Sequence, residues 1–204
     1  AAGAATGDGR GTATATVYGG PPARLAQAAA TLAAVSAGRA RLGLGTSTRK
    51  AVEDLHGMSF ENPARRLHET AELAGKFLNG SGRVSYEGDV FEVADFPALG
   101  ADVPVYTAAL GPATRRATGR VADGWLPHNV PFGRLSEAFE TIAERARERG
   151  RDPESITVAP YIPAAVSDDP ERAREAIRGH VAYYVGSGAG YRRAVAQQFP
   201  DGAE

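Results

Sequence analysis

The segment "RLGLGTSTRK", residues 41–50, joins an apolar run to a polar loop. Leu42 and Leu44 alternate with glycines, which is typical of a short strand inside a sheet. Gly45 ends this strand, and small hydroxyl residues follow at once. A glycine at such a place permits either a tight exit from the sheet or the close approach of another group to the backbone. The segment therefore predicts a buried strand whose carboxyl end meets either a sharp turn or a ligand.

Strands and helices alternate along the rest of the chain. Strands are predicted over residues 11–17, 41–45, 103–109, 122–127 and 155–166. Helices are predicted over about 21–38, 63–79, 111–122, 134–149, 170–184 and 189–199. A small hairpin is predicted over 83–93, with its turn at Gly88-Asp89. This alternation indicates a parallel α/β sheet with right-handed crossovers.

The first helix has an apolar face at helical spacing. Its expected buried residues are Leu25, Ala29, Leu32 and Val35. Gly38 stands where a C-terminal cap is expected.

Composition excludes several classes of partner. The formal net charge is −1 with no long run of either sign, so nothing favours nucleic acid or an anionic membrane. No apolar run approaches the roughly 20 residues that span a bilayer, and no signal-peptide pattern opens the chain. The chain has no cysteine, and its His, Asp and Glu residues lack metal-ligand spacing. We therefore expect a cytoplasmic enzyme without a metal.

Two architectures fit a parallel α/β chain. An open doubly wound sheet needs no fixed number of strands, whereas a (β/α)8 barrel needs eight strands and typically about 250 residues. Five strands are predicted in 204 residues. Counting strands alone favours the open sheet.

A strand, a Gly-Pro turn and a helix follow one another in "VYTAALGPATRRATGRVADGW", residues 105–125. The end of the strand, the turn and the first helical residues are Ala109, Leu110, Gly111, Pro112, Ala113 and Thr114. Proline fits the first helical position, and the free amides after it lie at the positive end of the helix dipole. Such a helix start suits a phosphate, although Gly-Pro also opens helices that bind nothing.

Four segments in a fixed order carry a resemblance to a known family. They are "LAQAAATLAAVSAGRARLGLGTS", "HGMSFENPARRLHETAELAGKFLNG", "YEGDVFEV" and "VPVYTAALGPATRRATGRVADGW". Together they resemble the bacterial luciferase-like superfamily, and within it the branch of oxidoreductases that use the deazaflavin coenzyme F420. The resemblance implies a (β/α)8 TIM barrel with a small hairpin insertion. On this interpretation residues 1–204 form a single, incomplete barrel domain that holds strands three to seven and lacks the first two and the eighth.

The same resemblance implies a set of cofactor contacts. Gly45, Thr46 and Ser47 would lie against the deazaflavin ring, with Thr16 as a further contact. A bulge with a non-prolyl cis peptide behind the ring would fall at about Ala13-Thr14. The backbone amides that hold the cofactor phosphate would be those of Leu110, Gly111, Ala113 and Thr114, within the cofactor-binding segment 109–114.

The sequence also departs from the sugar-phosphate dehydrogenases of this family. Thr48 stands where they carry a glutamate that acts as acid or base, and a hydroxyl near its ordinary pKa does not replace it unaided. Their substrate-phosphate threonine and lysine match His128 and Pro131. A sugar phosphate is therefore not the expected substrate.

Two histidines are candidates for catalysis. His128 lies at a predicted strand end beside Trp125, and His56 follows the strand at 41–45 in a segment expected to be irregular. Each is either a substrate contact or proton donor, or an ordinary polar rim residue. His68 and His180 fall inside predicted helices and are expected to face solvent or a neighbouring helix. Three aromatic residues near strand ends either wall a pocket or pack in the barrel: Tyr106, Trp125 and Tyr161.

The leading hypothesis is an oxidoreductase that transfers a hydride between F420 and a small organic substrate, as a homodimer. One alternative is an FMN-dependent luciferase-like monooxygenase. Another is a shortened, non-catalytic relative that binds a flavin without turnover.

Overall fold

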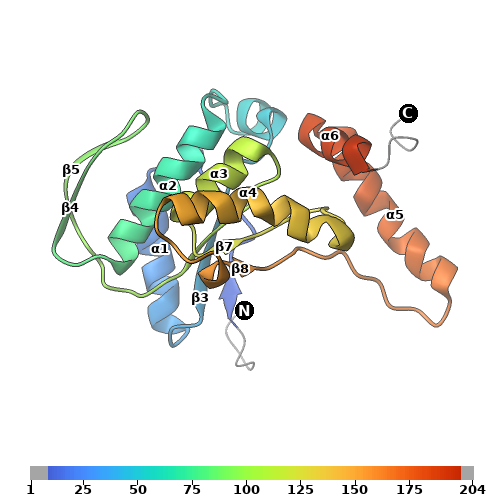
Figure 1. Ribbon diagram of the computed structural model, residues 1–204, viewed down its shortest axis with the longest axis horizontal. Helices are drawn as coiled ribbons and strands as arrows, with labels where there is room; N and C mark the ends of the chain where they lie inside the picture. Colours follow the sequence, from blue (N-terminus) through green and yellow to red (C-terminus); the bar gives the residue numbers. More distant parts are fainter. Residues whose placement is uncertain (1–8, 199–204) are drawn as a thin grey trace.

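The computed structural model of the protein describes residues 9–198, which form a curled parallel sheet with helices packed along one side (Figure 1). The strands run in the order β1, β3, β6, β7 and β8, and β2 also pairs with β3. Their bounds are Arg10–Gly11 (β1), Ala15–Thr16 (β2), Ala40–Gly45 (β3), Val105–Thr107 (β6), Gly124–Trp125 (β7) and Thr157–Val158 (β8). Every pairing in this sheet is parallel, so the predicted α/β class is confirmed.

The predicted strand at 11–17 is wrong in one respect, because the structure divides it into β1 and β2. Both pair with β3, through Arg10 opposite Ala40 and Ala15 opposite Leu44. Between them the hydroxyl of Thr12 donates to the Gly43 carbonyl at 2.7 Å and accepts from the Gly43 amide at 3.1 Å. Between β1 and β2, the Thr12 side chain therefore makes the hydrogen bonds to β3 that backbone groups make elsewhere in the sheet.

The strand predicted at 41–45 is confirmed as β3, whereas the three strands that follow it in the sheet are shorter than predicted. β6, β7 and β8 are two or three residues long where 103–109, 122–127 and 155–166 were expected. Proline contributes no amide hydrogen to a sheet ladder, and Pro104 and Pro127 stand just outside β6 and β7. Beyond β8 a single further bridge joins His128 to Tyr161.

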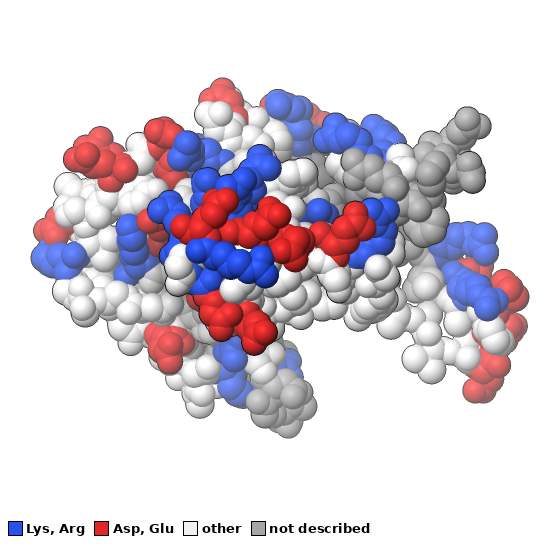
Figure 2. Space-filling model, viewed as in Figure 1, with Lys and Arg blue, Asp and Glu red and all other residues white. Residues whose placement is uncertain are grey.

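Within residues 9–198, six α-helices accompany the sheet. They are α1 (Pro22–Val35), α2 (Pro63–Asn79), α3 (Pro112–Val121), α4 (Leu135–Glu148), α5 (Pro170–Ser187) and α6 (Ala189–Gln198). Short helices occupy Ala51–Leu55 (η1), Phe132–Arg134 (η2) and Pro153–Ser155 (η3), so the segment after β3 is not wholly irregular as expected. No helix within residues 9–198 combines the length and the apolar character that crossing a membrane requires. Figure 2 shows acidic and basic side chains interleaved over α4, in line with the balanced charge.

The buried face of α1 differs from the predicted one. Ala26, Ala29 and Ala33 are buried, whereas Leu32 is 41% exposed and Val35 is 79% exposed. Small side chains let α1 lie close to β3 and α2, and the larger ones then point outward. Gly38 closes the end of α1, as predicted: its φ is 75° and its amide donates to the Ala33 carbonyl at 3.0 Å.

Two apolar clusters hold the helices on the sheet. The larger one joins α1 and α2 to β3 around Leu44, Leu67 and Phe77. The smaller one packs α4 on β7 around Trp125 and Ile142. These clusters leave the opposite face of the sheet free of helices.

The hairpin insertion consists of β4 (Arg83–Glu87) and β5 (Glu92–Pro97), and it lies at the opposite end of the molecule from α5 and α6 (Figure 1). Its turn begins at Gly88, as predicted. The buried carboxylate of Glu69 on α2 accepts hydrogen bonds from the amides of Asp89, Val90 and Phe91 at 2.9, 2.9 and 3.1 Å. A Cβ at Gly88 would lie 2.4 Å from this carboxylate, so glycine is required there.

Replacing Glu69 by alanine should therefore destabilise the fold. We expect Glu69→Ala to lower the free energy of unfolding by about 2–4 kcal/mol, because charge-assisted bonds are lost and three amides lose their partner. Urea denaturation measures the change. In the control, Glu72→Ala on the same helix, a half-buried carboxylate loses its ion pair with Lys76 and one hydrogen bond from the Tyr86 hydroxyl, so the cost should be smaller, about 1–2 kcal/mol. Equal losses for both variants would contradict this role of Glu69.

Candidate functional site

The carboxyl ends of the parallel strands meet at one edge of the sheet. Thr16 at the end of β2 lies opposite Gly45 at the end of β3, and Leu44 lies opposite Thr107 at the end of β6. The segments that follow these strands therefore share one rim, which is where barrel proteins bind ligands. This edge brings the predicted ring contacts and the predicted phosphate turn to the same side of the molecule.

The two residues after β3 present hydroxyl groups at this rim. Thr46 is half-buried and Ser47 is exposed. Ser47 has a φ of 59°, an uncommon conformation for a residue with a side chain, and such outliers cluster at functional sites. The Thr46 hydroxyl donates only to the Ser47 carbonyl at 3.2 Å, within its own loop.

The glycines of β3 have a structural explanation. A Cβ at Gly43 would lie 1.9 Å from the Thr12 carbonyl oxygen, and one at Gly45 would lie 2.4 Å from the Thr14 hydroxyl. The group that approaches these glycines is thus the neighbouring segment of the same chain. The peptide bond between Ala13 and Thr14 is cis, where the resemblance implied one.

The start of α3 has the geometry predicted for anion binding. Gly111 is the N-cap residue, Pro112 is the first helical residue, and no side chain caps the helix. Within the described chain, the amides of Ala113 and Thr114 have no backbone or side-chain acceptor. A Cβ at Gly111 would meet no atom within 4 Å, so space is open beside these amides.

Two buried hydrogen bonds fix the position of this helix start. The hydroxyls of Thr107 on β6 and Thr118 on α3 lie 2.7 Å apart. Below the turn, the Trp125 indole donates to the Ala109 carbonyl at 2.9 Å. Trp125 is fully buried, so the hypothesis that it walls a pocket is wrong, and Ala109 supports the turn from the protein side.

His128 lies in a cluster of aromatic side chains that sequence reasoning did not bring together. Its Nδ1 lies 2.7 Å from the Tyr191 hydroxyl. Ring centroids of Tyr184, Tyr161 and His180 lie 4.4, 4.9 and 6.2 Å from that of His128. The spacing of His180 and Tyr184, one helical turn apart on α5, was the only local signal of this cluster.

Burial controls the electrostatics of the His128 cluster. Burial lowers the pKa of His128, and the charge of a protonated His180 would lower it further. Burial also raises the pKa of Tyr191 to about 12. The Nε2 of His128 is buried without a hydrogen-bond partner in the described chain. The Tyr191 hydroxyl therefore orients the His128 imidazole, and the Nε2 of that imidazole is left without a hydrogen-bond partner among the described residues.

The remaining candidates lie elsewhere. His56 is exposed at the end of η1, and the structure does not join it to the His128 cluster. Tyr106 faces a hollow of about 390 Å³ on the open face of the sheet, together with Ala13, Gly43 and Leu126. Because side chains alternate between faces, these residues point away from the helices.

Comparisons with known proteins agree with this geometry. A family model described as luciferase-like monooxygenase matches residues 2–203. A phthiodiolone/phenolphthiodiolone dimycocerosates ketoreductase of Mycobacterium tuberculosis is 37% identical over 166 residues, covering 76% of this chain and 43% of its own length. An F420-dependent hydroxymycolic acid dehydrogenase of the same organism is 34% identical over 170 residues, covering 78% of this chain and 45% of its own.

A solved structure extends the comparison to the fold. The coenzyme F420-dependent tetrahydromethanopterin reductase of Methanopyrus kandleri superposes with a TM-score of 0.74 at 29% identity, covering 95% of this chain and 64% of that one. This agreement confirms the barrel-type fold and overturns the open sheet that strand counting favoured. The chain spans about half the length of the curated relatives that it matches.

The stability of the protein should depend on pH through its buried histidines. Burial lowers the pKa of both His128 and His68 below the ordinary value of 6.5, so the unfolded chain takes up protons first as the pH falls. The stabilisation that these two neutral histidines contribute is therefore fully present above about pH 6.5. It decreases as the pH falls toward the pKa values of the folded state. Urea denaturation between pH 7.5 and 5.5 measures this slope.

We expect His128→Gln to flatten part of that slope, because glutamine does not titrate. The control is Tyr161→Phe, which changes a neighbour of His128 and keeps its imidazole, so the slope from His128 should remain. If His128→Gln keeps the full slope, the imidazole is not buried as described.

Proposed function

Because the chain belongs to the luciferase-like monooxygenase family, we propose that it forms the cofactor-binding part of an oxidoreductase that transfers a hydride between coenzyme F420 and a small organic substrate. The observation that carries the proposal is the uncapped start of α3 at the rim of the sheet. Two relatives whose names state F420 dependence support the choice of cofactor.

The residues at the helix start fit a cofactor phosphate. The amides of Ala113 and Thr114 are proposed to donate to its oxygens, and the helix dipole adds a favourable potential. Gly111 leaves space beside the free amides, which a longer or negatively charged side chain at this position would occupy. Leu110 precedes Gly111 in the turn. Pro112 has no amide hydrogen, so Ala113 is the first helical residue that can donate to the phosphate.

The rim residues are proposed to hold the ring. The Thr46 hydroxyl is free to exchange its bond with the Ser47 carbonyl for one to the cofactor. Thr16 lies opposite Gly45 in the sheet, and Thr14 of the neighbouring segment lies close to Gly45. When bound, F420 supplies a ring carbon that donates or accepts a hydride.

His128 is proposed as the group that contacts the substrate and moves its proton. Its unpartnered Nε2 suits a substrate hydroxyl or carbonyl, and Tyr191 fixes the orientation of the ring. A lowered pKa keeps this imidazole neutral near pH 7, so Nε2 can accept a proton from an alcohol. The surrounding tyrosines limit the access of water.

Parallel titrations with F420 and FMN test the function. We expect binding of F420 and its reduction by an added alcohol, whereas preferred binding of FMN with oxygen consumption would favour the monooxygenase alternative. Binding without turnover would favour the non-catalytic relative. The homodimer and the cytoplasmic location stay predictions.

An acidic residue at the N-cap of α3 should block the phosphate site. We expect Gly111→Asp to weaken F420 binding at least tenfold, because the new carboxylate occupies the free amides and repels the phosphate. Aspartate is a good N-cap residue, so thermal stability should not fall. Fluorescence titration measures the affinity, and the uncharged control Gly111→Ala should bind within a few-fold of wild type. Unchanged affinity of Gly111→Asp would refute the site.

Removing the rim hydroxyl should weaken the ring contact. We expect Thr46→Val to raise the dissociation constant of F420 about fivefold, which corresponds to a lost neutral hydrogen bond of about 1 kcal/mol. The control, Thr31→Val, removes a hydroxyl on α1 that bonds only to the Gln27 carbonyl. A Thr46→Val variant that binds like this control counts against the ring contact.

A further inference from the structure

Two histidines meet in the aromatic cluster at the rim, although 52 positions separate them in the chain. His128 follows β7 and His180 lies on α5, and their ring centroids are 6.2 Å apart. Three tyrosines surround the pair: Tyr161 after β8, Tyr184 on α5 and Tyr191 on α6. The first turn of α6 lies beside the proposed phosphate turn, since a Cβ at Gly190 would be 3.7 Å from the Leu110 side chain. The cluster therefore adjoins the proposed cofactor site.

The ring nitrogens of His128 offer no direct path for a proton to water. Its Nε2 is buried, and its Nδ1 lies 2.7 Å from the Tyr191 hydroxyl. Because Nε2 is proposed to accept the substrate proton, the neutral ring carries its hydrogen on Nδ1 and donates it to the Tyr191 oxygen. Burial raises the pKa of Tyr191 to about 12, so this phenol keeps its own proton. A proton that His128 accepts needs another way out.

His180 connects the inside of the cluster to water. Its Nε2 is buried without a hydrogen-bond partner in the described chain. Its Nδ1 has no hydrogen bond within the described residues either, but this atom is not buried and is accessible to solvent. Gly179 and Val181, its neighbours on α5, are exposed, and α5 lies at the outer end of the molecule (Figure 1). The two nitrogens of one ring thus face the cluster and the solvent.

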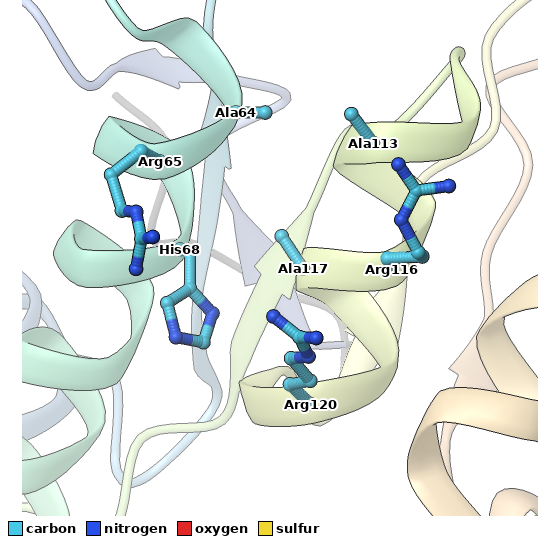
Figure 3. A pocket seen from close by; sticks show the side chains of 7 residues that line it. All are labelled: Ala64, Arg65, His68, Ala113, Arg116, Ala117 and Arg120. Atoms are coloured by element: carbon cyan, nitrogen blue, oxygen red, sulfur yellow. The ribbon is translucent and has the colours of Figure 1, made fainter.

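The charge on this pair is set by the two rings themselves. Among the described residues, the one histidine that pairs with a carboxylate is His68, whose Nε2 lies 3.6 Å from Glu72. His68 lies outside the cluster, in the groove between α2 and α3, where Figure 3 shows it beside Arg120. In the cluster the groups that face the pair are the three tyrosines, and a protonated His180 lowers the pKa of His128. Because the two charges repel, we expect the pair to carry one proton at a time.

We propose that His180 takes up the proton that His128 accepts from the substrate and releases it to solvent, an inference that rests on the proposed function. When an alcohol is oxidised to a carbonyl compound, the hydride that leaves its carbon carries two electrons to the cofactor. The hydroxyl proton goes to Nε2 of His128. It then passes through one water molecule to Nε2 of His180, and one proton leaves His180 from Nδ1. His128 is neutral again, and in the direction of reduction the same path supplies the proton.

Exchange of the His128 ring protons with water tests the inference without a substrate. Nuclear magnetic resonance of protein with isotope-labelled histidine follows these protons at about pH 6.5, the ordinary pKa of histidine. We expect His180→Gln to slow their exchange about tenfold or more, because glutamine does not accept a proton. A mere loss of packing would expose His128 and make the exchange faster. The control His68→Gln removes another half-buried imidazole, on α2, and should leave the exchange of His128 unchanged.

Turnover connects this proton path to the reaction. With F420 and cyclohexanol as the probe, we expect His180→Gln to lower kcat about tenfold and to leave the affinity for F420 unchanged. Added imidazole should restore turnover of His180→Ala, because it takes the place of the missing ring. Thermal melts confirm that each variant is folded.

Each outcome has one interpretation. Slower exchange together with a lower kcat supports the inference. Unchanged or faster exchange in His180→Gln, or an unchanged kcat, overturns it and leaves the proposed function standing. Absence of F420 binding by the wild-type protein overturns the proposed function. In that case, or if cyclohexanol is not oxidised, the exchange measurement alone decides whether His180 carries protons.

Discussion

Parallel pairing of β3 with β2 on one side and β6 on the other is the constraint on which the site depends. Parallel strands direct all their carboxyl ends to the same edge, so the loops after them meet there whatever their sequence separation. Thr46 and Gly111 lie 65 positions apart in the chain and share this rim only because the sheet joins their strands. The crossover helix α2 connects them on the covered face.

Close packing at that sheet explains several residues that resemble ligand contacts. Gly43 and Gly45 leave room for Thr12 and Thr14 of the adjacent segment, so the neighbouring backbone occupies space that a side chain would need. Gly88 does the same for the carboxylate of Glu69. By contrast, a Cβ at Gly111 would meet open space. Among these four glycines, only Gly111 has space open beside free amides.

The start of α3 and the groove beside it share one electrostatic character. Free amides and a helix dipole create positive potential at Ala113, and the arginines of α3 continue it along the helix. Elsewhere on the surface several arginines pair with nearby glutamates, and the formal net charge of the chain is −1.

The sequence by itself determined the parallel α/β class, the bounds of α2 and α4 within a residue or two, the hairpin turn at Gly88 and the uncapped start of α3. These features depend on local periodicity and on glycine and proline, whose conformational preferences act over a few residues. Tertiary structure alone decided the break between β1 and β2, the alanine face of α1, the burial of Trp125 and the cluster of His128 with Tyr184 and Tyr191. These contacts join residues far apart in the chain, and which partner lies opposite depends on packing that no local pattern encodes.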